Sequence, residues 1–180
     1  MKRNIKSLAM TMALATSLSF ASPNNGNSNP NPSQDALEAK VRHELLMLPY
    51  FGIFDNLQFR VEDGKVTLLG QAMRPTLRSD AGNVVKRIEG VTEVKNEIEV
   101  LPLSRFDDQI RLSVARNVYG QVALNRYALG SQPSIHIVVK NGNVTLEGVV
   151  ASRMDSQIAN MQANATGGVF SVTNNLRTER

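Results

Sequence analysis

The sequence contains the stretch DGKVTLLG at residues 63–70 and a close copy, NGNVTLEG, at residues 141–148. Each copy begins with an Asp-Gly or Asn-Gly pair, which is the strongest short signal for a β-hairpin turn. Each continues as a Val-Thr-Leu strand that ends on glycine. The two copies therefore predict two hairpins of the same design.

The similarity extends well beyond these two stretches. With a constant offset of 78 residues, Val61–Val100 aligns without a gap on Val139–Thr178, and eleven of the forty pairs are identical. About two or three identities are expected by chance, so we interpret the chain as a duplicated domain. The glycines shared by the copies, to which we assign a structural role, are Gly64, Gly70 and Gly90 in the first and Gly142, Gly148 and Gly168 in the second.

Residues 1–21 have the pattern of a secretory signal peptide. A basic start precedes an apolar run from Leu8 to Phe20, and Ser19-Phe20-Ala21 is a small-x-small cleavage site. The alternative is a membrane anchor, but a bilayer span needs about 20 apolar residues.

The chain has no cysteine, which excludes disulfides, thiol nucleophiles and a lipid-modified cysteine. We predict an exported, unlipidated, periplasmic protein.

The remaining chain divides into a linker and two domains. Residues 22–34 are mostly Asn, Pro, Ser and Gly, which predicts a disordered linker. We place the first domain at residues 35–102 and the second at 103–180. The predicted fold class is α+β: two tandem αββαβ domains, each a three-stranded mixed sheet with two helices packed on one face.

Helix signals give this order in both domains. In the first, we expect Asp35 to cap an amphipathic helix, Pro75 to open a second helix, and Gly90 to end it. A single strand is expected over Val94–Val100. In the second, Ser104 and Ser152 are predicted N-caps, and Gly167-Gly168 is expected to end the last helix. The inward face of that helix is predicted to consist of Met154, Ile158, Met161 and Ala165.

Charge is spread unevenly over the chain. The formal net charge is +4, but three of the 20 basic residues lie in the signal segment, which leaves 17 Lys and Arg against 16 Asp and Glu. Residues 35–102 carry 9 basic and 11 acidic residues, whereas residues 103–180 carry 8 and 5. Only the second domain favours an anionic partner, and export with near-neutral charge disfavours nucleic acid.

The turn glycine followed by Val-Thr-Leu-x-Gly, the downstream Gly-Val pairs at residues 90–91 and 168–169, and the αββαβ order resemble the BON domain. The resemblance covers residues 35–180, and a tandem pair behind a signal peptide is typical of periplasmic members of the osmotically inducible type. It implies a non-catalytic module that associates with phospholipid membranes and supports envelope integrity under stress. The second copy departs from the pattern in a longer connection, residues 120–133, and in its Asn-rich second helix.

No catalytic or metal-binding pattern accompanies this fold. His43 and His136 are the only histidines, and neither has a second ligand at metal-binding spacing. Asp107 and Asp108 stand at a predicted helix start, where carboxylates complement the helix dipole. The sequence therefore predicts no enzyme activity, no cofactor and no small-molecule substrate.

Two surfaces are candidates for binding. A membrane surface needs cations and amphipathic side chains, and the second domain offers them in its first helix and the connection after it. The lipid-binding candidates are Arg111, Arg116, Tyr119, Arg126 and Tyr127. The alternative for the arginines is an ordinary solvated helix face.

The second candidate is a protein-binding adaptor surface, for envelope proteins, in the aromatic segment around Tyr50, Phe51, Ile53 and Phe54. Exposed aromatic patches commonly mark interfaces. The alternative is that this segment folds over its own core or docks against the second domain. Exposure of Phe51 and Phe54 distinguishes the two interpretations.

Overall fold

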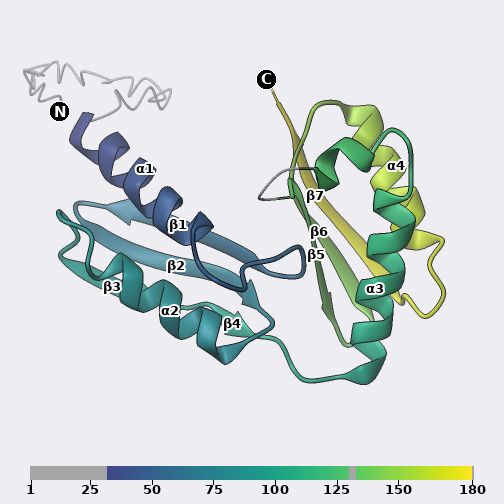
Figure 1. Ribbon diagram of the computed structural model, residues 1–180, viewed down its shortest axis with the longest axis horizontal. Coiled ribbons are helices and arrows are strands. Elements are labelled where there is room, and N and C mark those ends of the chain that lie inside the picture. The colour runs from purple at the N-terminus through teal and green to yellow at the C-terminus, as the bar shows by residue number, and fades with distance from the viewer. Residues whose placement is uncertain (1–31, 130–132, 180) are drawn as a thin grey trace, which may run out of the picture.

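The computed structural model describes residues 32–129 and 133–179, which form two αββαβ domains placed end to end along the long axis (Figure 1). The first domain consists of α1 (Pro32–Leu46), β1 (Asn56–Glu62), β2 (Lys65–Ala72), α2 (Pro75–Val85), β3 (Glu93–Asn96) and β4 (Glu99–Val100). The second consists of α3 (Arg105–Tyr119), the 3₁₀ helix η1 (Asn125–Ala128), β5 (Ile135–Lys140), β6 (Asn143–Val150), α4 (Arg153–Asn164) and β7 (Ser171–Thr178). The predicted signal peptide and most of the predicted linker lie outside the described residues.

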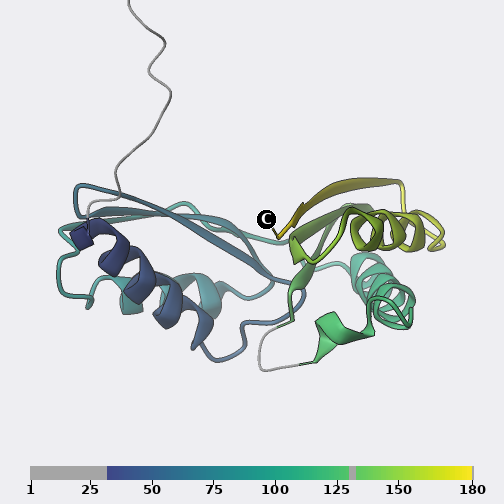
Figure 2. The ribbon, with the colours of Figure 1, turned by 90° about the horizontal axis from the view of Figure 1, so that it is seen from above.

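Both sheets have the same topology. The second strand of each hairpin is central; it pairs antiparallel with the first strand and parallel with the last. Both helices of a domain lie on one face of its sheet (Figure 2). Each domain has its own core, centred on Val66 and Leu68 in the first and on Val144 and Leu146 in the second. The predicted fold class is confirmed.

The repeated stretches form the hairpins that the sequence predicts. Asp63 and Gly64 have φ angles of 49° and 79°, and Asn141 and Gly142 have 52° and 77°. Positive φ at both turn residues matches the right-handed twist of the flanking strands. The register is identical in the two domains, because Val61 pairs with Val66 as Val139 pairs with Val144.

The glycine at the end of each repeated stretch is required because the backbone of the neighbouring strand passes too close for a side chain. A Cβ atom on Gly70 would lie 2.0 Å from the Asn56 carbonyl oxygen, and one on Gly148 would lie 2.0 Å from the Ser134 carbonyl oxygen. Both glycines also have positive φ. No other residue fits here without moving the neighbouring strand.

Three helix termini differ from the predictions. Helix α1 begins at Pro32, so Asp35 lies in its first turn and is not the N-cap, because proline is well suited to a first helical position. Helices α2 and α4 end at Val85 and Asn164, each several residues before the glycines expected to end them. Gly90 and Gly168 instead take positive φ in the turns that lead to the last strand.

The prediction for the inward face of α4 was correct for Ile158, which is half-buried against the core, and wrong for Met154, Met161 and Ala165. Met154 and Met161 are 63% and 58% exposed, whereas Ala159 and Ala163 are fully buried against the sheet. Ser152 caps the helix by accepting a hydrogen bond from the Asp155 amide, as predicted. The helix packs closely through these alanines together with Ile158, and the two methionines point outward.

The third strand of the first sheet is divided into β3 and β4, whereas β7 is continuous. At the equivalent position of both strands an asparagine, Asn96 or Asn174, bonds to the helix beside it. The Asn96 Nδ2 donates to the Arg78 carbonyl at 2.7 Å, and the Asn174 Nδ2 donates to the Ser156 carbonyl at 3.1 Å. Each asparagine Oδ1 also accepts from the amide two residues on. This explains one of the identities between the repeats.

Candidate functional site

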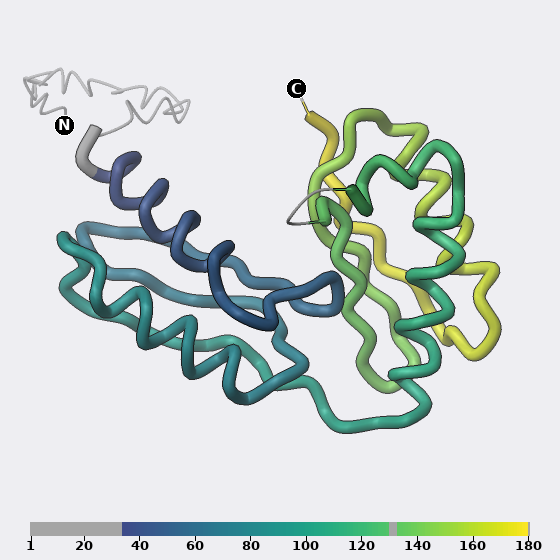
Figure 3. The backbone as a smooth tube through the Cα atoms, in the orientation of Figure 1, coloured from purple at the N-terminus to yellow at the C-terminus, as the bar shows by residue number. Residues whose placement is uncertain are grey.

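Residues 50–55, here called the aromatic loop, follow α1 and reach β5 of the second domain (Figure 3). The Ile137 amide donates to the Ile53 carbonyl at 2.7 Å, and the His136 Nδ1–H donates to the Gly52 carbonyl at 3.2 Å. The Phe51 ring stacks on the His136 imidazole at 5.4 Å between ring centres. The loop therefore acts as a bridge within the molecule.

This position decides between the two interpretations of the aromatic residues. Phe51 packs on the core of the first domain, Phe54 packs on the core of the second, and both are half-buried. Tyr50 remains 69% exposed, with the Arg74 guanidinium 4.8 Å above its ring. Because two of the three rings are occupied inside the molecule, the loop is not the exposed aromatic patch that an adaptor surface requires.

The domain contact also holds two titratable groups. Burial lowers the pKa of His136 below its ordinary value, despite its hydrogen bond to Gly52 and the nearby Asp55 carboxylate. Burial raises the pKa of Asp55, although its carboxylate accepts from the amides of Met73 at 2.7 Å and Gly52 at 3.0 Å. Burial therefore shifts the pKa of each group in the direction that favours its neutral form more than water does.

The outer edge of β5 is bonded at three successive outward residues by side chains and by the aromatic loop. The Tyr119 hydroxyl donates to the Ile135 carbonyl, the Ile137 amide reaches Ile53, and Arg111 Nη2 donates to the Val139 carbonyl at 2.6 Å. An edge strand that is already engaged at three successive outward residues is less open to pairing with another strand.

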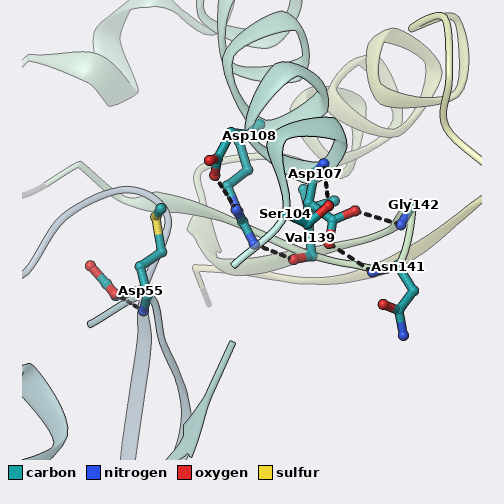
Figure 4. Close-up of polar contacts among 9 residues, drawn as sticks. Asp55, Ser104, Asp107, Asp108, Val139, Asn141 and Gly142 are labelled. Atoms are coloured by element: carbon teal, nitrogen blue, oxygen red, sulfur yellow. Dashed lines mark hydrogen bonds and ion pairs between the residues drawn. The ribbon is translucent and has the colours of Figure 1, made fainter. Parts of the chain in front are cut away.

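Arg111, expected as a lipid-binding cation, is instead a structural residue. It is only 2% exposed, and its Nη1 pairs with the Asp108 carboxylate at 2.5 Å (Figure 4). Its Nε has no hydrogen-bond partner. Leu112, the next residue on α3, is exposed in its place. The expectation was wrong because helical spacing shows only which residues share a face of α3. Arg111 points inward because the Val139 carbonyl, at the edge of the sheet, accepts a hydrogen bond from its guanidinium.

Asp107 lies fully buried beside it at the start of α3. Its amide donates to the Ser104 hydroxyl at 3.2 Å, which confirms the predicted N-cap. Its carboxylate accepts from the amides of Asn141 at 2.9 Å and Gly142 at 2.8 Å, so it binds the turn of the repeated stretch (Figure 4). Asp107 thus holds the hairpin turn in place, while Asp108 pairs with Arg111.

The longer connection of the second domain forms a second polar cluster. The Tyr127 hydroxyl donates to Asp155 Oδ2 at 2.7 Å, and Arg126 Nη2 bonds to the same oxygen at 2.5 Å. These contacts, with that from Tyr127 the strongest, lower the pKa of Asp155. The Tyr127 hydroxyl also accepts from the Ala151 amide at 2.8 Å. The connection therefore binds the start of α4.

The five lipid-binding candidates are not brought together as one exposed set. Arg116 and Arg126 are exposed, Arg111 and Tyr127 are buried, and Tyr119 is half-buried with its hydroxyl bonded to the sheet. Burial raises the pKa of Tyr119. Only the two arginines can meet a head group without rearrangement.

The helical layer of the second domain, defined as α3 and α4, carries a surface that the sequence analysis missed. Its large exposed apolar side chains are Phe106 and Leu112 on α3 and Met154 and Met161 on α4. Met154, Met161 and Ala165 are exposed on α4, whereas Ile158, at helical spacing between the two methionines, is half-buried against the core. The spacing itself was recognised, but it could not indicate which side faces the sheet.

Cations accompany this apolar surface. Arg105, Arg116 and Arg153 are exposed on the helical layer. Among the described residues of α3 and α4, the acids are Asp107 and Asp155, which are buried, and Asp108, which pairs with Arg111. The helical layer therefore combines exposed methionines with cations and presents no unpaired carboxylate.

Within the part of the chain that the structure describes, no cluster of three or more His, Cys, Asp or Glu residues could hold a metal ion. No helix in those ranges is long and apolar enough to cross a bilayer.

Comparison with known proteins gives one clear family match. Two solved structures of CdsD from Chlamydia trachomatis, a structural protein of the type III secretion system, resemble the chain at 11% identity. One covers 80% of this chain and 92% of its own, with a TM-score of 0.32; the other, its C-terminal domain, covers 80% and 98%, with a TM-score of 0.28. No curated protein matches the chain.

The BON domain matches twice, at residues 33–102 and 112–180, which together span most of the sequence. BON domains occur in periplasmic and membrane-associated proteins and are in general not catalytic. With both repeats matched and the predicted αββαβ fold present in each, the chain belongs to the BON domain family as a tandem member.

Proposed function

We propose that the protein is a non-catalytic, exported component of the cell envelope that binds weakly to anionic phospholipid surfaces and supports envelope integrity under stress. The binding surface is the helical layer of the second domain. The observation that carries this proposal is the outward position of Met154 and Met161 beside exposed arginines.

Such a surface suits the boundary between water and lipid. Flexible methionine side chains enter the acyl region at low cost, and arginines on the rim meet the phosphates. Each cation contributes about 1 kcal/mol at an anionic surface. Three arginines with a few partly inserted apolar side chains give weak binding that falls as salt screens the charges.

This placement revises the candidate residues. Arg116 stays in the proposed surface, Arg126 lies next to it, and Arg111, Tyr119 and Tyr127 leave it because they hold the domain together.

The test is co-sedimentation of the full mature protein with phosphatidylglycerol vesicles and with phosphatidylcholine vesicles, at low and high salt. We expect pelleting only with the anionic vesicles, and less of it at high salt. Absence of pelleting at low salt contradicts the proposal.

Variants locate the surface. Changing Met154 and Met161 together to Ser should reduce the bound fraction at least fivefold, and changing Arg116 and Arg153 to Ser should do the same. Met47→Ser is the matched control, because Met47 is 69% exposed but lies at the end of α1 in the first domain. If Met47→Ser reduces the bound fraction as much as the other variants do, the binding surface is not the helical layer.

The stress role is tested separately in cells. A deletion strain should lose viability under hyperosmotic shock, and the Met154 and Met161 double variant should fail to restore it. If that variant restores full viability, the stress role does not depend on membrane binding through the helical layer.

A further inference from the structure

In the second domain, a segment from outside that domain already binds the edge of the sheet through its backbone. The Ile137 amide on β5 donates to the Ile53 carbonyl of the aromatic loop at 2.7 Å. The groups on either side, the carbonyls of Ile135 and Val139, are taken by Tyr119 and Arg111. The outer edge of β5 is therefore a docking edge that is already occupied.

The equivalent edge in the first domain is β1. With the offset of 78 residues, Leu57, Phe59 and Val61 correspond to Ile135, Ile137 and Val139. The two-residue turn makes Glu62 and Lys65 a hydrogen-bonded pair, whose backbone groups face each other. Because the direction alternates along a strand, the amides and carbonyls of residues 61, 59 and 57 point away from β2. Leu57, Phe59 and Val61 thus present their backbone groups at the outer edge.

Among the described residues, one of these three edge positions has a backbone group bonded from outside its sheet. Gln34 Nε2 donates to the Val61 carbonyl at 3.1 Å, which corresponds to the role of Arg111 at Val139. In residues 32–129 and 133–179 no group from outside the sheet bonds to the backbone of Leu57 or Phe59. The position equivalent to Ile137, where the aromatic loop docks, is thus open in the first domain.

A groove of about 660 Å³ runs along this open edge. Its floor is β1 from Leu57 to Val61, one wall comes from α1, and the other comes from the uncovered face of the second sheet. The wall residues are Glu38 and Arg42 on α1, and Glu147, Asn175 and Arg177 on the second sheet. The groove therefore lies between the two domains and beside an unpaired strand.

The charges in the groove indicate the chemistry of its occupant. Arg42, Arg60 and Arg177 line it, and the Arg42 guanidinium lies 5.5 Å from the centre of the Phe59 ring. The lining also holds two acids, and these keep their charge because their donors are neutral amides: Glu38 accepts from Gln34 at 3.3 Å and Glu147 accepts from Asn175 at 2.7 Å. Arg60 Nε lies 3.9 Å from a Glu62 carboxylate oxygen, whereas Arg42 and Arg177 have no such carboxylate partner among the described residues. Three arginines against two glutamates give the lining a net charge of +1, which favours a ligand that carries carboxylates.

The other free edges of the sheets are less suited to a partner strand. The edge formed by β3 and β4 is interrupted at Glu97 and Ile98, and short or interrupted edges resist pairing. On β7 the Leu176 amide already bonds to the Asn174 side chain.

We propose that the groove along β1 binds an extended acidic segment of a partner protein, which adds to the first sheet as a further strand. Backbone hydrogen bonds to Leu57 and Phe59 supply affinity, and the arginines select acidic side chains. This site is separate from the proposed membrane surface and does not depend on it.

The test uses the full mature protein and two synthetic probes. One is a seven-residue peptide of alternating Val and Asp, blocked at both ends, and the other has Lys in place of Asp. We expect the acidic peptide to bind at least tenfold more tightly than the basic one. Amide hydrogen exchange, read by NMR, should slow at least tenfold at Phe59 when the acidic peptide saturates the protein.

Charge reversal then tests the site. Arg42→Glu with Arg177→Glu should weaken binding of the acidic peptide at least tenfold. Lys86→Glu with Arg87→Glu is the matched control, because both residues are exposed after α2 and away from the groove, and it should leave binding unchanged. Arg177→Ser alone should also weaken binding of the acidic peptide, but by less. Because Arg177 is exposed on β7, this single variant should fold normally and keeps the test valid if the double variant misfolds.

Several results would overturn the proposal: no binding of the acidic peptide, equal binding of both peptides, protection confined to β7, or equal losses from groove and control variants. The proposal would also be overturned if anionic vesicles displaced the peptide and slowed hydrogen exchange at the Phe59 amide themselves, because the groove would then be a lipid site.

Discussion

The buried Asp107 carboxylate should be one of the most important side chains for the stability of the second domain. It accepts from the amides of Asn141 at 2.9 Å and Gly142 at 2.8 Å, and no solvent reaches it. A hydrogen bond to a charged group contributes about 1.5–3 kcal/mol. Asp107→Ala removes two such bonds and leaves two amides without partners, so we expect a loss of about 3–5 kcal/mol.

The measurement is urea unfolding of the full protein followed by far-UV circular dichroism, since the chain has no tryptophan. With a slope of about 1.5 kcal/mol per molar urea, this loss lowers the midpoint of the second domain by about 2 M or more. Amide hydrogen exchange at Gly142 should lose its protection at the same time, because that amide loses its acceptor.

Asp35→Ala is the matched control. Asp35 also lies in the first turn of the first helix of a domain, but it is exposed, so its removal costs only the dipole contribution of about 0.3–1 kcal/mol. If Asp107→Ala costs no more than Asp35→Ala, then the carboxylate does not hold the turn and this reasoning is wrong.

Three further predictions concern other contacts. Asn174→Ala should destabilise the second domain by about 1–3 kcal/mol, and Asn96→Ala should have a similar effect on the first, because each asparagine joins the last strand to a helix; equal stability in urea would contradict this. Burial lowers the pKa of His136, so the domain contact is most stable above the unfolded pKa of about 6.5 and weakens as pH falls through that value. The melting temperature should therefore decrease between pH 7.5 and pH 5.5 in the natural protein and decrease less in His136→Phe; parallel curves would exclude this histidine as the cause. Gly148→Ala should prevent the normal pairing of β5 with β6, because its Cβ would meet the Ser134 carbonyl at 2.0 Å, and native-like thermal stability would contradict the observed register.

The repeated stretch was sufficient to predict the fold, and the reason is local. Two-residue turns with positive φ, alternating Val and Leu, and a glycine at the strand exit each depend on a few neighbouring residues. The constant offset of 78 residues extended this inference over both domains. The αββαβ order and the family therefore followed from the sequence.

Predictions that needed the direction of a helix face or the extent of a helix were less successful. The spacing of Met154, Ile158, Met161 and Ala165 indicates one side of a helix but contains nothing about where the sheet lies. Likewise Arg111 has the composition of a surface cation, and it is buried because an edge carbonyl of β5 lies within its reach.

The sequence by itself determined the hairpins, the duplication and the fold of each domain, because those depend on turn chemistry and on periodic burial close along the chain. Only the tertiary structure decided where the aromatic loop docks, which side of α4 is exposed, and which sheet edge remains open. These depend on contacts between segments far apart in sequence, such as Ile53 with Ile137 and Asp107 with Gly142. No local pattern records such contacts, because hydrogen-bonding groups pair with whatever partner the packed molecule brings within about 3 Å.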